Sequence, residues 1–236
     1  MAIRYILFDL DGTLLPMDQE LFIKAYVKGL AAKMAPYGYD PKVIGDALWK
    51  GTGAMMKTDG KLRNDELFWQ VFQGIVGQFT PEHFAAVDDF YHNEFRSVRE
   101  VCGFTPRAAE IVGKVKALGF IPVLATNPLF PALATESRVR WAGLQPKDFA
   151  HITVYDNSHF CKPNVAYYEE VLATIGATAE ECVMIGNDAK EDTAVEALGM
   201  QVFLLTDCLI NSDGRDIEKY PHGGFDELIE FIERLR

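Results

Sequence analysis

Short apolar runs that end abruptly at polar or acidic residues restrict the fold of this chain more than any other feature of its sequence. The runs cover 5–8, 121–125, 182–185 and 201–205, with a weaker run at 152–154. Each is about as long as a buried β-strand. Strands that are apolar on both faces are typical of parallel sheets that helices cover on both sides. The pattern therefore predicts a parallel sheet at the centre of the protein.

Amphipathic segments lie between these runs and predict the helices that cover the sheet. The predicted helices are 107–118, 164–175 and 193–198, and each is followed by a glycine. Proline precedes the first two segments, at Pro106 and Pro163, and proline is well tolerated at the start of a helix. Because strands and helices alternate in this way, we expect an α/β protein with a doubly wound parallel sheet.

Residues 17–104 interrupt this alternation. The stretch is long and rich in helix-compatible residues, and its sequence shows no run typical of a buried strand. The predicted helices within it are 19–34, 42–50, 65–72 and 81–95, separated by Pro36, the loop Gly51-Thr52-Gly53 and Gly77. We therefore expect an inserted α-helical domain at 17–104 and a core formed by 1–16 and 105–236.

Composition excludes several classes of partner. The chain of 236 residues has 34 acidic and 23 basic residues, which gives a formal net charge of -11. An excess of negative charge repels nucleic acid and anionic membranes, so we expect neither as a partner. The apolar run near the amino terminus is interrupted at Asp9, which argues against a signal peptide or a membrane span. We expect a cytoplasmic protein.

The cysteines and histidines give no sign of a disulfide framework or a zinc site. The cysteines are Cys102, Cys161, Cys182 and Cys208, and no two of them form a C-x-x-C pair. The five histidines are scattered and show no H-E-x-x-H spacing. Reduced and mostly buried thiols are therefore the expectation.

Two aspartates stand where the first apolar run ends. Asp9 and Asp11 are two residues apart, so their side chains share one side of an extended chain. Gly12-Thr13 then turns the chain. Open parallel sheets bind ligands at the carboxyl ends of their strands, so the pair predicts two carboxylates that face one ligand site. Taken alone, an Asp-Gly pair also occurs in ordinary solvated turns.

Polar residues stand at three further positions of this kind. Thr126-Asn127 follows the run 121–125, Lys162 precedes a predicted helix, and Gly186-Asn187-Asp188-Ala189-Lys190-Glu191-Asp192 follows the run 182–185. Each has an ordinary explanation alone: a threonine at a strand end, a solvated lysine, or acids at a helix start. Four such segments at strand ends and helix starts are a more specific signal. The sequence contains no G-x-x-x-x-G-K-[ST] loop, which excludes that nucleotide-binding motif.

The segment Phe8-Asp9-Leu10-Asp11-Gly12-Thr13 resembles the first motif of the haloacid dehalogenase (HAD) superfamily, and the three later segments resemble its remaining motifs in order. The resemblance spans nearly the whole chain outside 17–104. It implies a Rossmann-like core with a helical, C1-type cap, and it implies a phosphatase. The dehalogenase branch of the superfamily lacks an acid at the position of Asp11, which disfavours carbon–halogen chemistry here.

The resemblance also implies a role for individual residues. It implies Asp9 as the nucleophile and Asp11 as the general acid and base. Lys162 and Thr126 would stabilise the charge that develops during the reaction. The phosphate-binding residues that it implies are Gly12, Thr126, Asn127 and Lys162.

Mg²⁺ is the cofactor that the resemblance implies. This ion prefers oxygen ligands and keeps several waters, so the side chain of Asp9, the backbone carbonyl of Asp11 and one acid of the last segment suffice. The superfamily often has an aspartate directly after the glycine, where this chain has Asn187. We favour Asp188 as the ligand because a carboxylate attracts Mg²⁺ more strongly than an amide, with Asn187 and Asp192 ordering ligands or waters. The choice between Asn187 and Asp188 stays open at this point.

These expectations describe a phosphohydrolase that cleaves a small phosphorylated metabolite through an aspartyl-phosphate. A phosphomutase shares the covalent step and is the nearest alternative. A phosphonate-cleaving relative would need a cap lysine that the sequence does not mark. A non-catalytic phosphate-binding or regulatory protein, such as a receiver domain, is the alternative of another class, but a receiver lacks so long an insertion after its first strand.

The sequence specifies neither substrate nor oligomeric state. The candidate specificity residues are Trp49, Lys57, Arg63 and Trp69.

Overall fold

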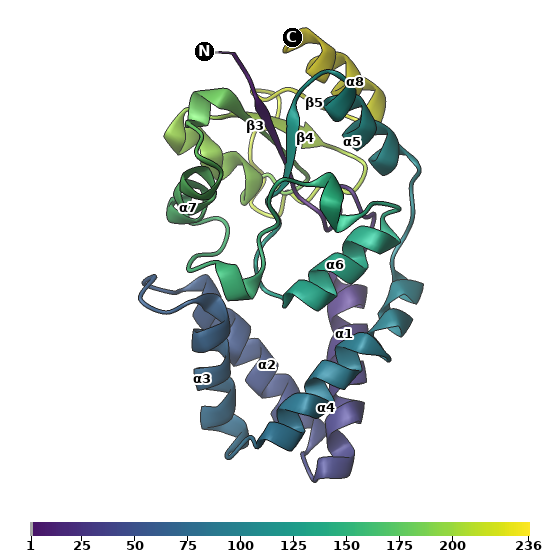
Figure 1. The fold of residues 1–236 in the computed structure, drawn as a ribbon, viewed down its shortest axis with the longest axis vertical. Helices are drawn as coiled ribbons and strands as arrows, with labels where there is room; N and C mark the ends of the chain where they lie inside the picture. The colour runs from purple at the N-terminus through teal and green to yellow at the C-terminus, as the bar shows by residue number, and fades with distance from the viewer. Residues whose placement is uncertain (1) are drawn as a thin grey trace.

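A five-stranded sheet lies at the end of the molecule that also carries both chain termini (Figure 1). The structure is a computed structural model that describes residues 2–236. The strands are β1 (Tyr5–Phe8), β2 (Ile121–Leu124), β3 (Cys182–Gly186), β4 (Gln201–Leu205) and β5 (His222–Gly223), in the spatial order β2-β1-β3-β4-β5. All neighbouring strands are parallel, which confirms the predicted α/β class.

The register of the sheet aligns the ends of three strands. Phe8, the last residue of β1, lies opposite Leu124 of β2 and Ile185 of β3. The backbone N–H of Asp9 donates to the carbonyl of Ile185 at 2.9 Å, which extends the pairing by one residue. The residues that follow these strands therefore leave the sheet at the same level, on the edge where parallel sheets bind ligands.

Helices cover both faces of the sheet because β1 directs alternate side chains into two apolar clusters. Ile6 and Phe8 belong to a cluster with α5 (Arg107–Ala117) and α8 (Phe225–Arg234). Tyr5 and Leu7 belong to one with α7 (Val165–Ile175) and the 3₁₀ helix η6 (Asp192–Leu198). Burying one such side chain completely contributes about 1.5–3 kcal/mol. The doubly wound arrangement is confirmed.

The start of α7 shows how local sequence fixes an element near the sheet edge. The side chain of Asn164 accepts a hydrogen bond from the backbone N–H of Ala166 at 3.0 Å, which is a favourable helix cap. Gly176 ends the helix in the left-handed conformation, with a φ of 64°. Pro163 lies directly before the cap residue, so it precedes the helix as predicted, and a cis peptide bond joins it to Lys162.

The opposite end of the molecule is helical (Figure 1). It contains α1 (Gln19–Met34), η1 (Ala35–Tyr37), α2 (Pro41–Met56), α3 (Asn64–Val76), α4 (Pro81–His92) and η2 (Phe95–Val101). We call residues 17–104 the helical segment. Its two ends meet: the N–H of Gly103 donates to the carbonyl of Pro16 at 2.7 Å, and a β-bridge joins Met17 to Cys102. The chain thus enters and leaves the segment at neighbouring points.

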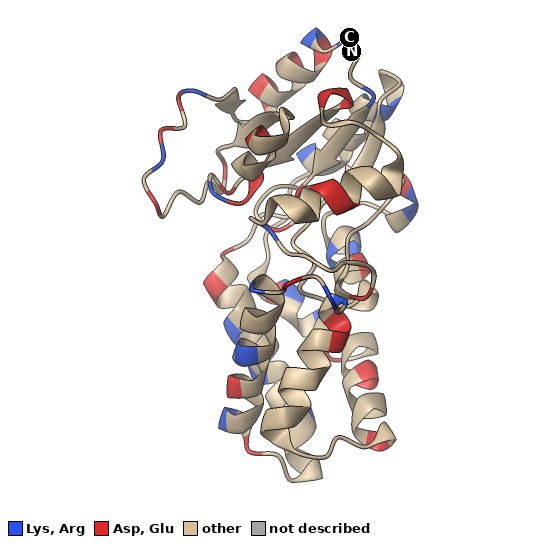
Figure 2. Ribbon diagram, turned by 90° about the vertical axis from the view of Figure 1, so that its left-hand side faces the viewer, with Lys and Arg blue, Asp and Glu red and all other residues tan. Residues whose placement is uncertain are grey.

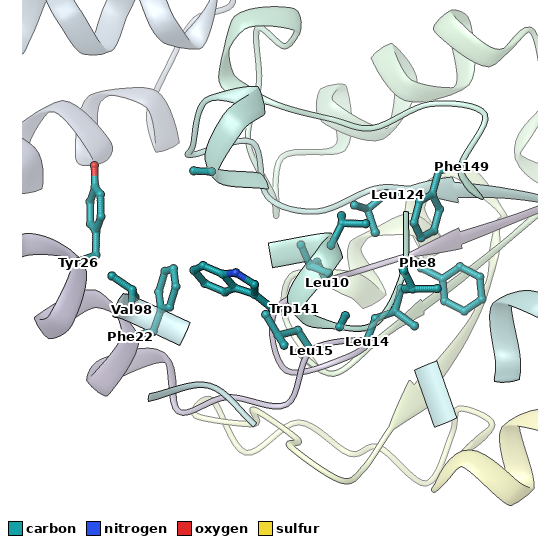
Figure 3. Close-up of a cluster of buried hydrophobic side chains, with 14 of the residues drawn as sticks. Phe8, Leu10, Leu14, Leu15, Phe22, Tyr26, Val98, Leu124, Trp141 and Phe149 are labelled. Atoms are coloured by element: carbon teal, nitrogen blue, oxygen red, sulfur yellow. The ribbon is translucent and has the colours of Figure 1, made fainter. Parts of the chain in front are cut away.

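One buried apolar cluster connects the sheet with the helical segment. Figure 3 shows it extending from Phe8 and Leu14 through Trp141 of α6 (Ala132–Trp141) to Phe22 and Tyr26 of α1. Side chains from both parts are buried in this cluster, so close packing holds the two parts together in this arrangement.

Two sequence-based predictions for short segments are wrong. Residues 152–154 form no strand, because Ile152 makes only an isolated bridge to Leu124. The loop at Gly51-Thr52-Gly53 is absent, because α2 continues to Met56. A Cβ on Gly51 would lie 2.7 Å from the ring of Phe68, so this glycine allows α3 to pack closely against α2 and does not end the helix.

Several elements were not predicted from the sequence. They are β5, α6, α8 and the 3₁₀ helices η1, η2, η3 (Pro146–Asp148), η4 (Tyr155–Asn157) and η5 (Ala179–Glu181). The predicted helix 193–198 is the 3₁₀ helix η6, and the predicted helix 81–95 ends at His92. The four cysteines are not paired with one another. Within residues 2–236, the helices are too short or too polar to cross a membrane.

Candidate active site

The carboxylate of Asp9 stands at the carboxyl end of β1 and is held at both oxygens. Its Oδ1 accepts a hydrogen bond from Nζ of Lys162 at 2.9 Å, and its Oδ2 accepts one from Oγ1 of Thr13 at 3.1 Å. Only 7% of the Asp9 surface is exposed. The side chain is therefore fixed in direction and largely shielded from water, which suits the nucleophilic role expected from the sequence.

Lys162 is completely buried and connects two acids. Besides Asp9, its ammonium donates to Oδ1 of Asp192 at 2.7 Å. Burial by itself lowers the pKa of a lysine, but the carboxylates of Asp192 and Asp9 outweigh it and hold the pKa of Lys162 well above its usual value. Lys162 is therefore positively charged beside Asp9 at neutral pH.

Asp11 faces a basic residue that no sequence motif marks. Its carboxylate pairs with Nη1 of Arg138, a completely buried residue of α6. Nη2 of Arg138 donates to Oγ1 of Thr135 at 3.2 Å, and the guanidinium carbon lies 4.5 Å from the ring centre of Phe130. Burial raises the pKa of Asp11, and the charge of Arg138 opposes that rise without cancelling it. A fixed cation thus orients Asp11.

Thr126 and Asn127 follow β2 and are fixed by neighbouring polar groups. The carbonyl of Thr126 accepts hydrogen bonds from Oγ1 of Thr153 at 2.6 Å and from the hydroxyl of Tyr167 at 2.9 Å. Nδ2 of Asn127 donates to the two carboxyl oxygens of Glu191 at 3.0 and 3.1 Å. Burial raises the pKa of Glu191 to about 8. The contact between Asn127 and Glu191 is a feature that sequence reasoning missed.

Asn187, in the loop after β3, is engaged at both ends of its amide. Its Oδ1 shares the hydroxyl of Thr13 with Asp9, at 2.9 Å, and its Nδ2 donates to the carbonyl of Cys208 at 2.7 Å. Gly12 has a φ of 89°, and a Cβ there would lie 2.3 Å from Nδ2 of Asn187. The first and last motifs of the sequence therefore touch because position 12 is glycine.

The same loop directs Asp188 and Asp192 toward the sheet edge. Oδ1 of Asp188 accepts hydrogen bonds from the N–H groups of Lys190 and Glu191 at 2.7 and 2.9 Å. Oδ2 of Asp192 accepts one from the N–H of Asp188 at 2.9 Å. A Cβ on Gly186 would lie 2.0 Å from Oδ2 of Asp192, so only glycine fits before this loop.

One cavity of about 230 Å³ brings most of the predicted site residues together. The predicted residues that line it are Asp9, Asp11, Thr126, Asn127, Asn187, Asp188 and Asp192. Lys162 reaches the site through its bonds to Asp9 and Asp192. Gly12 does not line the cavity but lies against the side chain of Asn187, which does. The backbone N–H of Gly12 donates to the carbonyl of Leu15 at 2.8 Å. A phosphate-binding role for Gly12 stays a prediction.

The candidate specificity residues differ in their positions. Trp49 lines this cavity, and Trp69 lines a smaller apolar cavity beside it. Arg63 is exposed and donates to Oδ1 of Asp65 at 3.1 Å, and Lys57 is also exposed. Only the two tryptophans are therefore placed to contact a ligand in this structure.

The chemistry of the site fits a divalent cation such as Mg²⁺. Five acidic side chains line the cavity, and Lys162 and Arg138 are the two basic side chains that bond to them, so the site carries an excess of negative charge. Among residues 2–236, no three His, Cys, Asp or Glu side chains form a metal-holding group. Mg²⁺ needs only one or two protein carboxylates because it keeps several waters. Asp9, the carbonyl of Asp11 and Asp188 are such a set.

A family model described as haloacid dehalogenase-like hydrolase matches residues 3–199. No curated protein matches the sequence.

Solved structures share the fold at low sequence identity. A HAD phosphatase from Thermococcus onnurineus superposes with a TM-score of 0.59 at 15% identity, covering 98% of both chains. A 2-haloacid dehalogenase from Pseudomonas syringae pv. Tomato DC3000 gives 0.61 at 20% identity, covering 99% of this chain and 100% of that chain. The putative HAD-hydrolase YfnB from Bacillus subtilis, bound to magnesium, gives 0.56 at 17% identity, covering 98% of this chain and 99% of that chain.

Proposed function

Because the chain belongs to the haloacid dehalogenase-like hydrolase family, we propose that it is a magnesium-dependent phosphatase that acts on a small phosphorylated metabolite. One observation carries the proposal: the carboxylate of Asp9 is held between Lys162 and Thr13, with a second acid, Asp11, two residues further along the same site. The HAD phosphatase of similar fold adds support.

In the proposed reaction, a carboxylate oxygen of Asp9 attacks phosphorus in line and the bond from phosphorus to the ester oxygen breaks. The protonated carboxyl of Asp11 gives its proton to the departing alkoxide. Asp11, now ionised, takes a proton from the water that attacks the phosphorus of the aspartyl-phosphate. The bond from phosphorus to the Asp9 oxygen then breaks, which releases inorganic phosphate and restores the Asp9 carboxylate. Lys162 offsets negative charge beside Asp9 throughout, and Thr126 and Asn127, which line the same cavity, are the residues that we propose to hold phosphoryl oxygens.

Asp11 is the reason to favour a phosphate ester over a carbon–halogen bond as the substrate. An alkoxide needs a proton to leave readily, whereas a halide ion leaves without one. The pairing with Arg138 orients the carboxyl of Asp11 and keeps it within the cavity. A residue with this function would be superfluous in a dehalogenase.

Bound Mg²⁺ would offset charge on the phosphoryl group, and Asp9, the carbonyl of Asp11 and Asp188 would hold it. The hydrogen bonds support Asp188 over Asn187 as the direct ligand. Both ends of the Asn187 amide are occupied, by Thr13 and Cys208. Asp188 bonds to backbone N–H groups through Oδ1, which leaves Oδ2 for the ion.

Release of inorganic phosphate from a panel of sugar, nucleoside and carboxylic acid phosphates, with Mg²⁺ and with EDTA, tests the proposal. Replacing the nucleophile by Asp9→Asn should lower kcat by roughly 10⁴-fold or more. Asp46→Asn is the matched control, because Asp46 is an exposed acid of α2 whose contact with Lys50 is a surface ion pair. Its turnover should equal that of the unmodified protein.

Other outcomes identify the alternatives. Chloride release from 2-chloropropionate without phosphatase activity would indicate a dehalogenase. An isomerised sugar phosphate without free phosphate would indicate a phosphomutase. A folded protein that binds inorganic phosphate but hydrolyses no ester would indicate a non-catalytic binding protein.

A further inference from the structure

The wall of the active-site cavity that faces the acids is apolar. From the helical segment it receives Met17, Phe22, Ile23, Trp49 and Met56, and its polar residues are Gln19 and Thr52. Charged residues are frequent on the helical segment (Figure 2). Within the described chain, however, none of those that belong to this segment lines the cavity. The charge of the cavity is thus confined to the sheet side.

A second cavity of about 80 Å³ adjoins the first and extends the apolar surface. The residues that line both cavities are Ile23, Trp49, Thr52, Leu129 and Phe130. Beyond this shared wall, the second cavity is lined by further aliphatic and aromatic side chains, including Trp69 and Phe72. No charged side chain of residues 2–236 lines it. A molecule that has its phosphate beside Asp9 would direct the rest of its structure toward this surface.

A second anionic group on such a molecule would find no partner. A buried charge is strongly unfavourable unless an opposite charge or hydrogen-bond donors compensate it. Lys162 is already engaged with Asp9 and Asp192, and Arg138 with Asp11. A carboxylate or second phosphate of the substrate would therefore be unpaired.

A group with many hydroxyls would also be poorly accommodated. Gln19 and Thr52 are the two polar side chains that the helical segment gives to the active-site cavity. In the second cavity, the hydroxyls of Tyr26 and Tyr91 bond to each other at 2.8 Å. Hydroxyl groups that lose water without gaining partners weaken binding.

We infer that the substrate is the phosphate monoester of an apolar alcohol, whose aromatic or branched aliphatic group lies against the shared wall of Trp49, Ile23 and Phe130. This inference rests on the proposed phosphatase activity and names the class of ester on which it acts. An apolar group gains favourable burial on this wall, and it carries no charge that the acids of the sheet side would repel.

Three esters of primary alcohols with similar leaving groups test the inference: 3-phenylpropyl phosphate, glycerol 3-phosphate and the phosphate ester of 3-hydroxypropanoate. We expect kcat/KM for the phenylpropyl ester to exceed that of each other ester by about tenfold or more. Equal values, or a preference for the charged ester, would overturn the inference and leave the phosphatase proposal intact. If the protein hydrolysed neither these three esters nor any other phosphate ester, the phosphatase proposal itself would be overturned.

Two substitutions of the shared wall refine the test. Trp49→Ala should lower the preference for the phenylpropyl ester, and Trp49 is 62% exposed, so its loss spares the core. Thr52→Arg places a cation on the wall and should raise relative activity on the charged ester by about tenfold. Leu21→Ala is the control, because Leu21 is 50% exposed on α1 and lies outside both cavities. An unchanged preference in both Trp49→Ala and Thr52→Arg would contradict the inference.

Discussion

On the sheet side of the cavity, acidic and basic side chains are buried and bonded to one another, whereas on the helical side the lining is apolar and partly exposed. Asp9, Lys162 and Asp192 form a connected buried group, while Trp49 is 62% and Met56 44% exposed. Buried charges have few arrangements of low free energy, because each must keep its partners. Apolar side chains at a partly exposed surface can be exchanged with small effects. The two walls should therefore respond very differently to substitution.

The largest effect should come from Lys162→Met on the sheet side. The substitution leaves the carboxylates of Asp9 and Asp192 facing each other without a cation. Breaking a buried ion pair in this way lowers the free energy of unfolding by about 3–5 kcal/mol, which urea denaturation measures. Lys50→Met is the control, since its exposed pair with Asp46 contributes about 1 kcal/mol or less. Equal effects of the two substitutions would show that the buried charges of the sheet side are no more constrained than a surface ion pair.

Asp188→Asn should weaken metal binding without unfolding the protein. We expect the Mg²⁺ concentration for half-maximal activity to rise by about 10–100-fold. The shift in melting temperature that Mg²⁺ produces in the unmodified protein should shrink in parallel. A larger effect from Asn187→Ala than from Asp188→Asn would reverse the ligand assignment.

Gly51→Ala tests whether close packing behind the helical wall matters. Alanine stabilises a helix over glycine by up to about 1 kcal/mol, but a Cβ here meets the Phe68 ring at 2.7 Å. We expect a net loss of about 1–3 kcal/mol from overpacking. Gly53→Ala on the same helix is the matched control, because its Cβ would meet no atom within 4 Å. That substitution should stabilise the protein, and thermal unfolding compares the two.

Met56→Leu on the helical wall should have the smallest effect. Met56 lines the cavity but is partly exposed, so the free energy of unfolding should change by about 0.5 kcal/mol or less. KM should shift modestly while kcat stays constant, because the residue contacts no group of the proposed reaction. A large fall in kcat would show that the helical wall takes part in the chemistry.

Strands β1 to β4 and helix α1 were predictable because their patterns reflect simple burial. The bounds of β1 and β4 equal those expected from their apolar runs, and α1 covers the predicted 19–34. The end of α2 was not predictable, because glycine usually interrupts a helix and the packing of Phe68 is a tertiary effect. The buried face of α6 includes Thr135 and Arg138, which a hydrophobic pattern does not detect. In α8, by contrast, the apolar stripe is present in the sequence, so a helix could have been predicted there although none was.

The acids of the site were predictable as a group, since the register of parallel strands aligns the ends of β1 and β3. Arg138 was not, because its contact with Asp11 joins residues 127 positions apart and depends on the placement of α6. Glu191 contacts Asn127 across 64 positions for the same kind of reason. Strand-end chemistry can be inferred from local sequence, whereas the partners that orient it depend on the assembled fold.

The meeting of Pro16 with Gly103 and of Met17 with Cys102 has a consequence for how proteins of this architecture diversify. The two attachment points lie next to each other, so the sheet does not fix the length of the chain between them, although the helical segment shares a buried cluster with the sheet side. A replacement segment of another size that joins at the same points and keeps an apolar face against the sheet side would leave Asp9 and Lys162 where they are. New substrates could thus be acquired by exchanging one contiguous stretch of sequence while the reaction itself is inherited unchanged.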